Sequence, residues 1–448
     1  MPCAAPATQL GPAAGTGAAR DPSRPVTSTP ETAAPRWLPR GRLARNSLLA
    51  MFWQAGRVGA QALWIIIMAR LLGPAGYGAF SGVAGLANAL GGFVGLGLGL
   101  LMYQEIATRR EAFGARWRQT LATSLVTGVA FGILLVVAGG RWTGHAGWTI
   151  VLPLAISELV CFPLVTAAAL AFAAHERMGW AMALPALVGV ARLAAAATFA
   201  LLLPDRGLAG YVWFHALVTV GCAAGAVTFV ARELHPGTGT PLPTWRDVRE
   251  GLGFSMVWVT GNALSSLDKA LVLRFAGAEA AGIYSSAYRL ATALAVPMDA
   301  VVTAAMPRLF RDGAVARPRL TSRLFALTLA YGALAGAVLW FAAGLLPLLL
   351  GARFAPAVHA AQWLGLFLPC YGMRILGSNL LMATRRKKLR MIIECAGLGT
   401  LVVFGVRWLP TLGVDGALRM IIGTELLLGL ACWLALAAGL GAPRSGEA

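Results

Sequence analysis

Ionisable side chains inside long apolar segments are the residues of this sequence that could do chemistry. The cations in such segments are Arg57, Arg192, Lys269, Arg289, Arg374 and Arg419. The acids are Glu158, Asp268, Asp299, Glu394 and Glu425. A charge in the hydrocarbon core of a membrane costs about 2.5–3.5 kcal/mol, so we expect these groups to face a water-filled cavity or to pair with one another.

The cations indicate an anionic ligand. Arginine binds phosphate through two parallel hydrogen bonds. We therefore expect a substrate-binding cationic cavity for a phosphate-bearing molecule, lined by Arg57, Arg192, Lys269, Arg289 and Arg374. Arg419 and Glu394 lie near the ends of their segments, where long side chains reach the interface, and we expect structural roles for both.

Two of the acids are candidates for ion coupling. Asp268 and Glu158 could carry a proton or a sodium ion across the membrane. Asp268 and Lys269 are neighbours whose side chains point about 100° apart on a helix, so we expect them not to pair with each other. His215 also lies in an apolar segment, and we expect it to be packed and hydrogen-bonded there.

Motifs for other chemistry are absent from the sequence. It holds no GxxxxGK(S/T) phosphate loop and no HExxH or paired-histidine metal site. The six Cys form no CxxC and, apart from Cys3, fall inside apolar segments, so we interpret them as buried hydrophobes. We expect no cofactor, no metal and no enzymatic activity, because the outer loops are too short to carry a catalytic domain.

The composition is that of a membrane protein. Of 448 residues, 58% are hydrophobic and 12% are charged, whereas soluble domains carry about 25% charged residues. The net charge of +19 sits in short gaps between apolar runs, so we expect contacts with membrane lipids and not with nucleic acid. A soluble enzyme, a secreted disulfide scaffold and a disordered regulator are excluded.

Twelve apolar segments are each long enough to span a membrane as a helix, which takes about 20 residues. None alternates with a period of two, so the sequence predicts an all-α polytopic protein and not a barrel of strands. Before them, residues 1–45 hold eight of the 24 Pro and six Arg and predict a disordered basic cytoplasmic leader. The predicted spans are 46–72, 79–104, 118–139, 148–173, 180–203, 208–231, 251–275, 283–307, 321–350, 356–383, 391–410 and 416–440.

An internal repeat organises these spans. Residues 69–90 and 273–294 match at a constant offset of 204, including the pairs Gly78/Gly282 and Ser81/Ser285. Six helices separate the copies, which predicts two six-helix bundles, 46–231 and 251–440, related by a pseudo-two-fold axis along the membrane normal. Residues 232–250 are then a cytoplasmic linker, and 441–448 a cytoplasmic tail.

Basic residues predict the orientation. With the N-terminus inside, 25 of the 37 Lys and Arg lie in cytoplasmic parts and six lie in outer loops or at a helix end beside them. This asymmetry predicts a multi-pass protein of the inner (plasma) membrane with both termini in the cytoplasm.

Several stretches resemble the polysaccharide and lipid-linked oligosaccharide flippases of the multidrug/oligosaccharidyl-lipid/polysaccharide (MOP) exporter superfamily. RVGAQALWIIIMARLLGPAGYG (57–78) resembles the family's first helix and the turn that closes it, and LDKALVLRFAGAEAAGIYSSAYRL (267–290) resembles the start of its second half. LLGARFAPA (349–357) and LGVDGALRMIIGTE (412–425) are similar to the starts of its tenth and twelfth helices. The resemblance covers residues 46–440.

The resemblance implies a flippase whose substrate is a lipid-linked oligosaccharide on a polyprenyl-(pyro)phosphate carrier. Its cavity arginines would meet the phosphate while the two bundles rock to expose the cavity on alternate faces. Arg57, Asp268 and Arg289 lie in matching motifs. Arg192, Arg374 and Glu158 do not, and rest on the physical argument alone.

Other functions stay open at this point. A cation-coupled multidrug exporter of the same superfamily would need a more acidic and aromatic pocket. A membrane-embedded polysaccharide polymerase or ligase would need a catalytic outer loop. A scaffold would contact polysaccharide-biosynthesis enzymes through the basic loops 307–319 and 385–390, whose charge also fits topology and lipid head groups. The driving force is a proton gradient, a sodium gradient or the membrane potential.

Overall fold

The computed structural model describes residues 42–106, 109–142, 147–240, 242–312 and 318–440, and within these ranges it contains helices and no strand. The predicted tail, and all but the last four residues of the predicted leader, lie outside this description. By its internal contacts, the chain divides into residues 1–45 and a compact unit of residues 46–448.

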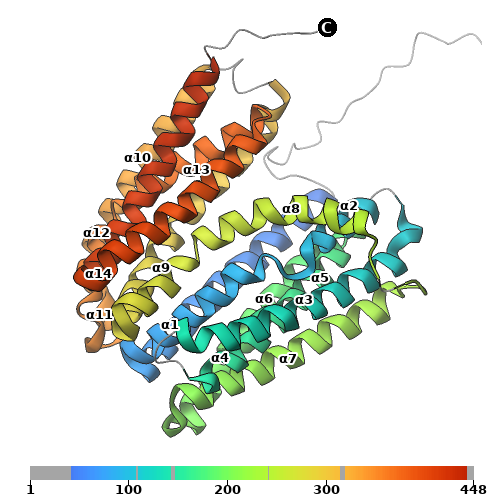
Figure 1. Ribbon diagram of the computed structural model, residues 1–448, viewed down its shortest axis with the longest axis horizontal. Helices are drawn as coiled ribbons and strands as arrows, with labels where there is room; N and C mark the ends of the chain where they lie inside the picture. The colour runs from blue at the N-terminus through green and yellow to red at the C-terminus, as the bar shows by residue number, and fades with distance from the viewer. Residues whose placement is uncertain (1–41, 107–108, 143–146, 241, 313–317, 441–448) are drawn as a thin grey trace, which may run out of the picture. The chain divides into compact units, whose positions relative to one another are not determined.

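The helical elements follow one another closely along the chain (Figure 1). In order they are α1 (Arg42–Gly91), η1 (Val94–Gly97), α2 (Leu98–Ile106), η2 (Arg110–Ala112), α3 (Phe113–Trp142), α4 (Trp148–Ala155), η3 (Ile156–Cys161), α5 (Phe162–Ala174), α6 (Met178–Leu202), η4 (Pro204–Arg206), α7 (Gly207–Leu234), α8 (Trp245–Leu264), α9 (Leu267–Asp312), α10 (Pro318–Ala342), η6 (Ala343–Leu345), α11 (Leu346–Leu350), η7 (Ala352–Phe354), α12 (Ala357–Leu364), α13 (Phe367–Ala383) and α14 (Lys387–Leu440).

The described residues hold eight helices that are long and apolar enough to cross a membrane, or nine if the bent pair α12 and α13 forms one span. Three of these helices are much longer than one crossing needs, and each is broken inside by a glycine with positive φ: Gly73 in α1, Gly277 in α9 and Gly413 in α14. The sequence predicted two spans at each of these places. At each of these places a single glycine turns the chain without a loop, so the two predicted spans are joined into one long helix.

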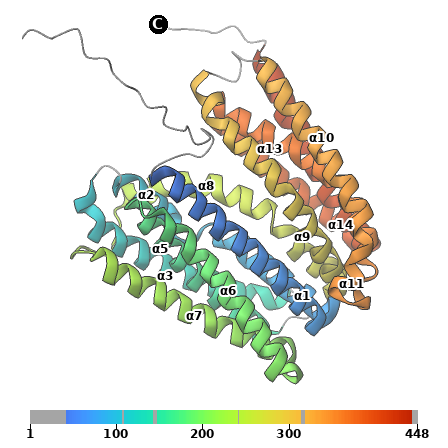
Figure 2. The same cartoon turned by 180° about the vertical axis from the view of Figure 1, so that it is seen from behind.

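The helices of residues 46–448 form two groups that both views show, α1 to α7 and α9 to α14 (Figures 1 and 2). Helix α8 contacts both groups. Its Thr260 donates a hydrogen bond to Glu394 Oε2 of α14 (2.7 Å), and its Gly251 packs against Leu96 and Gly97 beside α2.

The two copies of the repeat meet each other face to face. Ser81 donates a hydrogen bond to its counterpart Ser285 (2.9 Å between the Oγ atoms). A Cβ atom on Gly78 would overlap the backbone of Ala278, and a Cβ atom on Gly282 would overlap that of Pro74. Since 74 and 278 are also related by the offset of 204, the contacts that the two copies make with each other are reciprocal.

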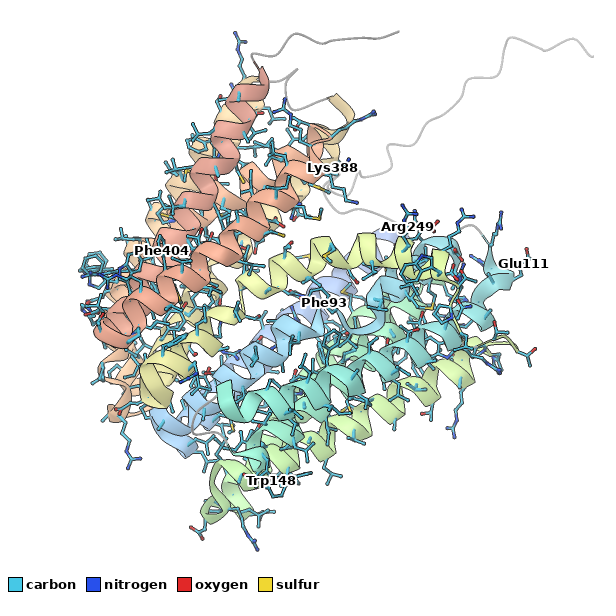
Figure 3. All side chains as sticks on the ribbon, in the orientation of Figure 1. Phe93, Glu111, Trp148, Arg249, Lys388 and Phe404 are labelled. Atoms are coloured by element: carbon cyan, nitrogen blue, oxygen red, sulfur yellow. The ribbon has the colours of Figure 1, made fainter. Side chains whose placement is uncertain are left out.

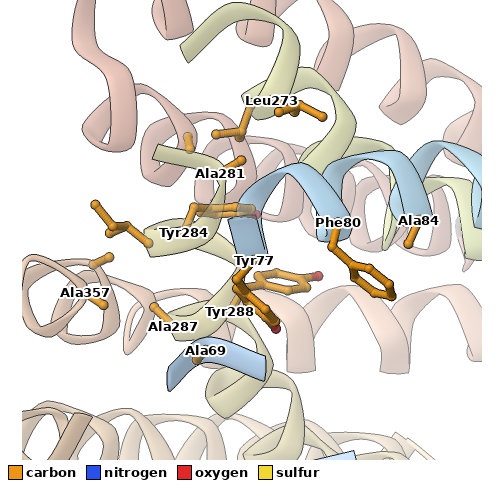
Figure 4. Packing of buried hydrophobic residues seen from close by; sticks show 14 of the residues in the cluster. Ala69, Tyr77, Phe80, Ala84, Leu273, Ala281, Tyr284, Ala287, Tyr288 and Ala357 are labelled. Carbon is orange, nitrogen blue, oxygen red and sulfur yellow. The ribbon is translucent and has the colours of Figure 1, made fainter. Parts of the chain in front are cut away.

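Aromatic side chains and one arginine make further contacts at the same junction. Tyr77, Tyr284 and Tyr288 gather where the two copies cross (Figure 4), and the rings of Tyr77 and Phe354 lie 6.4 Å apart. Arg70 donates hydrogen bonds to the carbonyl oxygens of Leu348 and Leu349 at the end of α11, both at 2.8 Å. A cation at a helix C-terminus satisfies carbonyl groups that the helix itself leaves open.

A polar cluster joins α3 to the start of α8. Arg116 forms ion pairs with Glu105 and, at 2.8 Å, with Asp247. Asp247 and Thr244 form a capping box at the N-terminus of α8. Burial would raise the pKa of Asp247, but hydrogen bonds from the Thr244 hydroxyl and backbone N–H and the nearby Arg116 guanidinium outweigh it, and the pKa is lowered.

We expect Gly78→Ala to lower the free energy of unfolding by roughly 1–3 kcal/mol, because the added methyl group overpacks a backbone contact. Gly59→Ala is the matched control in the same helix, since nothing lies within 4 Å of its Cβ position and Ala favours a helix over Gly by about 1 kcal/mol. Thermal unfolding in detergent should show a lower midpoint only for Gly78→Ala. Equal midpoints would contradict the close contact between the two copies.

We expect the Asp247 cluster to give stability that depends on pH. The lowered pKa means that this contribution is complete above the unfolded value of roughly 3.9 and disappears as the pH falls through the folded value. Asp247→Asn should therefore flatten the loss of thermal stability below about pH 4. Glu250→Gln, which removes an exposed ion pair with Arg246 in the same helix, should leave the pH profile unchanged.

Candidate functional site

A buried ionic cluster lies inside the first group of helices. Glu158 is on the π-helical turn η3, and its Oε1 accepts hydrogen bonds from Arg192 of α6 (2.7 Å) and from Ser157 (2.9 Å). His215 of α7 approaches the same oxygen with Nε2 at 3.4 Å. A π-helical turn has a wider hydrogen-bond spacing than an α-helix, which changes the directions of its side chains. In η3, both Ser157 and Glu158 are buried among the helices.

Hydrogen bonds extend this cluster to α1. Tyr211 contacts His215 Nδ1 at 3.2 Å, and Trp64 donates from its indole N–H to the Tyr211 oxygen at 2.6 Å. A carboxylate only accepts hydrogen bonds, so a neutral His215 would carry its proton on Nε2 and accept at Nδ1 from Tyr211. The network therefore links the charge on η3 to the first helix.

A second ionic cluster lies inside the other group, with the order of charges reversed along the chain. Arg374 of α13 donates from Nε to Glu425 of α14, and its guanidinium lies 5.1 Å from the centre of the Tyr371 ring. The Tyr371 hydroxyl in turn donates to Asp299 Oδ1 of α9 at 2.9 Å. Each of these three acidic and basic groups thus has a polar partner.

The expectation that Asp268 and Lys269 do not pair is wrong. Lys269 Nζ lies 2.9 Å from Asp268 Oδ1 and also donates to the Ser265 carbonyl oxygen at 2.7 Å. The two stems diverge from the first turn of α9, but the flexible lysine stem folds back so that its ammonium reaches the carboxylate. The Tyr284 hydroxyl donates to the other carboxylate oxygen at 2.6 Å.

Arg57 and Arg289 have no carboxylate partner among the described residues. Arg57 is exposed, and its Nε donates only to Gln54 Oε1 at 3.3 Å. Arg289 places its guanidinium 5.7 Å from the centre of the Trp64 ring, and Trp64 is two helical turns beyond Arg57 on the same face of α1. Arg57 and Trp64 thus form one strip on the surface of α1, and Arg289 of α9 lies beside it.

Two buried atoms beside this strip lack hydrogen-bond partners within the described part of the chain, Arg289 Nε and Tyr77 Oη. Tyr77 interacts electrostatically with Arg289 and is fully buried at the junction of the two repeat copies.

The predicted cavity cations thus divide into two classes. Arg192, Lys269 and Arg374 are neutralised by carboxylates, whereas Arg57 and Arg289 retain charge and hydrogen-bonding capacity for a ligand.

Two of the predicted charges, Glu394 and Arg419, remain to be placed. Glu394 accepts hydrogen bonds from Thr260, Ser378 and Arg390, and Arg419 is exposed. The described residues contain no group of three or more His, Cys, Asp or Glu that could hold a metal ion.

Sequence reasoning missed a cavity of about 460 Å³ beside the Glu158 cluster. It lies against the end of α1, η1, α2, α3, α5 and α8, and polar side chains from several of these elements line it, among them Asn88, Ser124 and Asn262. The signal was the run of glycines from 91 to 99, because glycine lets transmembrane helices approach closely and bend. Its consequence is a break in the helix, where Gly95, Leu96 and Gly97 all have positive φ.

Comparisons relate this fold to known proteins. A family described as "Polysaccharide biosynthesis protein" matches residues 43–311. No curated protein matches the chain.

Solved structures of transporters share the fold. An inward-facing multidrug resistance MATE family transporter of the MOP superfamily aligns with a TM-score of 0.68 and 15% identity, over 90% of this chain and 99% of that one. The lipid II flippase MurJ, in an inward closed conformation, aligns with a TM-score of 0.69 and 10% identity over 87% of each chain. A MOP superfamily transporter from Pyrococcus furiosus aligns at 0.55 and 17% identity, over 88% of this chain and 94% of that one. The chain therefore has the all-helical, multi-span fold of these transporters.

We expect Glu425→Gln to destabilise the protein by roughly 3–5 kcal/mol, because it leaves Arg374 buried without an anionic partner. The double variant Arg374→Met with Glu425→Met removes both charges and should recover most of the loss. Asp415→Asn in the same helix is the control, since its pair with His359 is more than half exposed and contributes little. Thermal midpoints that are equally low for the single and double variants would contradict the role of charge.

Proposed function

Because the chain belongs to the family of polysaccharide biosynthesis proteins, we propose that it is a flippase for an anionic glycolipid. Its substrate is an oligosaccharide linked to a polyprenyl-(pyro)phosphate, which it moves from the inner to the outer leaflet for polysaccharide export. The protein acts by transport and carries out no chemical conversion. The observation that carries the proposal is the pair Arg57 and Arg289, cations without a carboxylate partner at one strip of α1.

The proposed architecture has twelve spans. Dividing α1, α9 and α14 at their glycine breaks raises the nine candidate spans to twelve. They form two six-helix bundles, 46–231 and 251–440, related by a pseudo-two-fold axis along the membrane normal. The reciprocal contacts of Gly78 and Gly282 support this symmetry.

Both termini face the cytoplasm in this proposal. Arg249 and Lys388, which belong to basic cytoplasmic segments, lie at one end of the helices, and Trp148, which follows an outer loop, lies at the opposite end of its group (Figure 3). The closed junction at Gly78, Ser81 and Arg70 is then on the outer side. Substrate enters between the bundles from the cytoplasmic leaflet, and rocking of the bundles opens the outer side.

The phosphate group of the carrier is bound by Arg57 and Arg289, with Tyr77 as a further hydrogen-bond donor. Hydrogen bonds to charged groups contribute about 1.5–3 kcal/mol each, and a buried Arg289 Nε without a partner gains the most from a new acceptor. Arg192, Lys269 and Arg374 belong to the same charged interior but act through their carboxylate partners. Proton or sodium binding at Glu158 or Asp268 would release Arg192 or Lys269, which makes these acids the coupling candidates.

A cationic drug is the less suitable substrate. The ionised groups without a partner among the described residues at membrane depth are cations, and they would repel a second cation. The buried acids Glu158, Asp268 and Glu425 already bind basic side chains.

We expect Arg289→Gln and Arg57→Glu to reduce surface polysaccharide about tenfold or more in a host that lacks its own copy of the gene. The loss of one charged hydrogen bond corresponds to at least this factor, and lipid-linked intermediates should accumulate. Arg419→Gln removes an exposed arginine outside the strip and should leave export unchanged. Normal polysaccharide with normal amounts of either Arg289→Gln or Arg57→Glu protein in the membrane would refute the cationic site.

A further inference from the structure

The cavity of about 460 Å³ beside η1 has a polar lining that, apart from Glu158, lies outside the ionic clusters. The polar residues that line it come from α1, α3, η3, α5, α8 and the break that follows α8, and they include Asn88, Ser124, Glu158, Ser255, Asn262 and Ser266. On α8, Ser255 and Asn262 are seven residues apart and so lie on one face of the helix. Another side chain of α8, Thr260, binds Glu394 in the second group.

These polar groups have unused hydrogen-bonding capacity. The side chains of Asn88, Ser124, Ser255, Asn262 and Ser266 make no hydrogen bond with any part of the chain that the structure describes. Glu158 accepts all of its described hydrogen bonds at Oε1, which leaves Oε2 for another donor. Polar groups at membrane depth are costly unless a cavity supplies partners for them, so this lining is suited to a polar ligand.

The backbone beside the cavity is strained, and the backbone at the corresponding position 204 residues later is not. Leu96 has a φ of 49° between two glycines that also have positive φ, a conformation that L-residues with a side chain rarely adopt. At the offset of 204, the counterpart of Leu96 is Ala300, which lies within the helix α9. The repeated fold therefore does not require the break. Irregular backbone at membrane depth occurs where it lines a cavity, and transporters bind substrate at such broken helices.

The chemistry of the lining selects one class of ligand. The single carboxylate is neutralised by Arg192, so neither a metal cation nor a second anion is favoured. Amide and hydroxyl groups both donate and accept hydrogen bonds, as several adjacent hydroxyl groups of a ligand require. Phe162, Pro163 and Leu170 add apolar surface for the C–H faces of a ring. We propose that this cavity binds a neutral sugar residue of the glycolipid, an inference that rests on the proposed function.

The test compares two lipids on the purified full-length protein in nanodiscs. The probes are polyprenyl pyrophosphate and the same lipid carrying one neutral sugar, with glucose, galactose and N-acetylglucosamine tried in turn. We expect wild-type protein to bind at least one glycosylated lipid about tenfold more tightly than the bare lipid. Asn262→Leu and Ser124→Ala should reduce this preference at least threefold while the affinity for the bare lipid, which also reports correct folding, stays the same.

A matched pair of threonines provides the control. Thr166 lines the cavity and donates to its own helix at the Phe162 carbonyl (3.1 Å), and Thr228 makes the same bond to the Ala224 carbonyl (2.9 Å) on an exposed part of α7 away from the cavity. Thr166→Val should weaken the preference for the sugar, and Thr228→Val should not.

The outcomes separate this inference from the proposed function. Binding of the bare lipid that Arg289→Gln weakens supports the phosphate site whatever happens in the cavity. If the bare lipid binds but no glycosylated lipid is preferred, or if the preference survives in Asn262→Leu and Thr166→Val, the sugar site is refuted alone. If neither kind of lipid binds, the proposed function fails and the sugar site fails with it.

Discussion

A charge held in hydrocarbon must be neutralised or hydrated, and this constraint explains how the ionised side chains of this protein are arranged. Arg192, Lys269 and Arg374 each bind a carboxylate on a neighbouring residue or helix. Such pairs hold helices together because removing one partner leaves an uncompensated charge. Arg57 and Arg289 lack this compensation within the described residues, so they are the groups for which an external anion lowers the energy most.

The contact between the two repeat copies depends on a different constraint, the space between their backbones. At the junction, Gly78 and Gly282 perform the same task and have stayed identical, because any side chain would separate the backbones. Away from the junction the ionic clusters reverse their order along the chain, with the acid first at Glu158 and the base first at Arg374. Packing thus keeps the reciprocal contact between the copies, whereas a buried charge needs only a partner of opposite sign.

Much of this arrangement could be predicted from the sequence. Apolar segments predict the all-helical, multi-span fold, and the repeat at the offset of 204 relates Ser81 to Ser285, which the structure joins by a hydrogen bond. The pairing of Lys269 with Asp268 was mispredicted, because helix geometry fixes the direction of a stem but not where a flexible lysine places its charge. The cavity beside Leu96 could not be predicted either. Glycine runs occur both in tight helix contacts and in broken helices, and only the backbone conformation tells them apart.

The proposed separation of charged and neutral binding groups matches the proposed substrate, which has one end of each kind. A phosphate-bearing carrier presents the same charge whatever glycan it bears, so Arg57 and Arg289 can provide affinity and cannot distinguish one glycan from another. Discrimination among neutral sugars needs many directional hydrogen bonds without a dominant charge, since a strong ionic attraction would mask the small differences between hydroxyl patterns. Asn88, Ser124 and Asn262 offer such bonds in a cavity where Arg192 has already neutralised Glu158.

Helix α8 contributes to this lining and also binds α14 through Thr260, so a ligand that orders the lining acts on a helix that contacts both groups. In the proposed mechanism, recognition of the glycan and movement of the bundles are connected through α8.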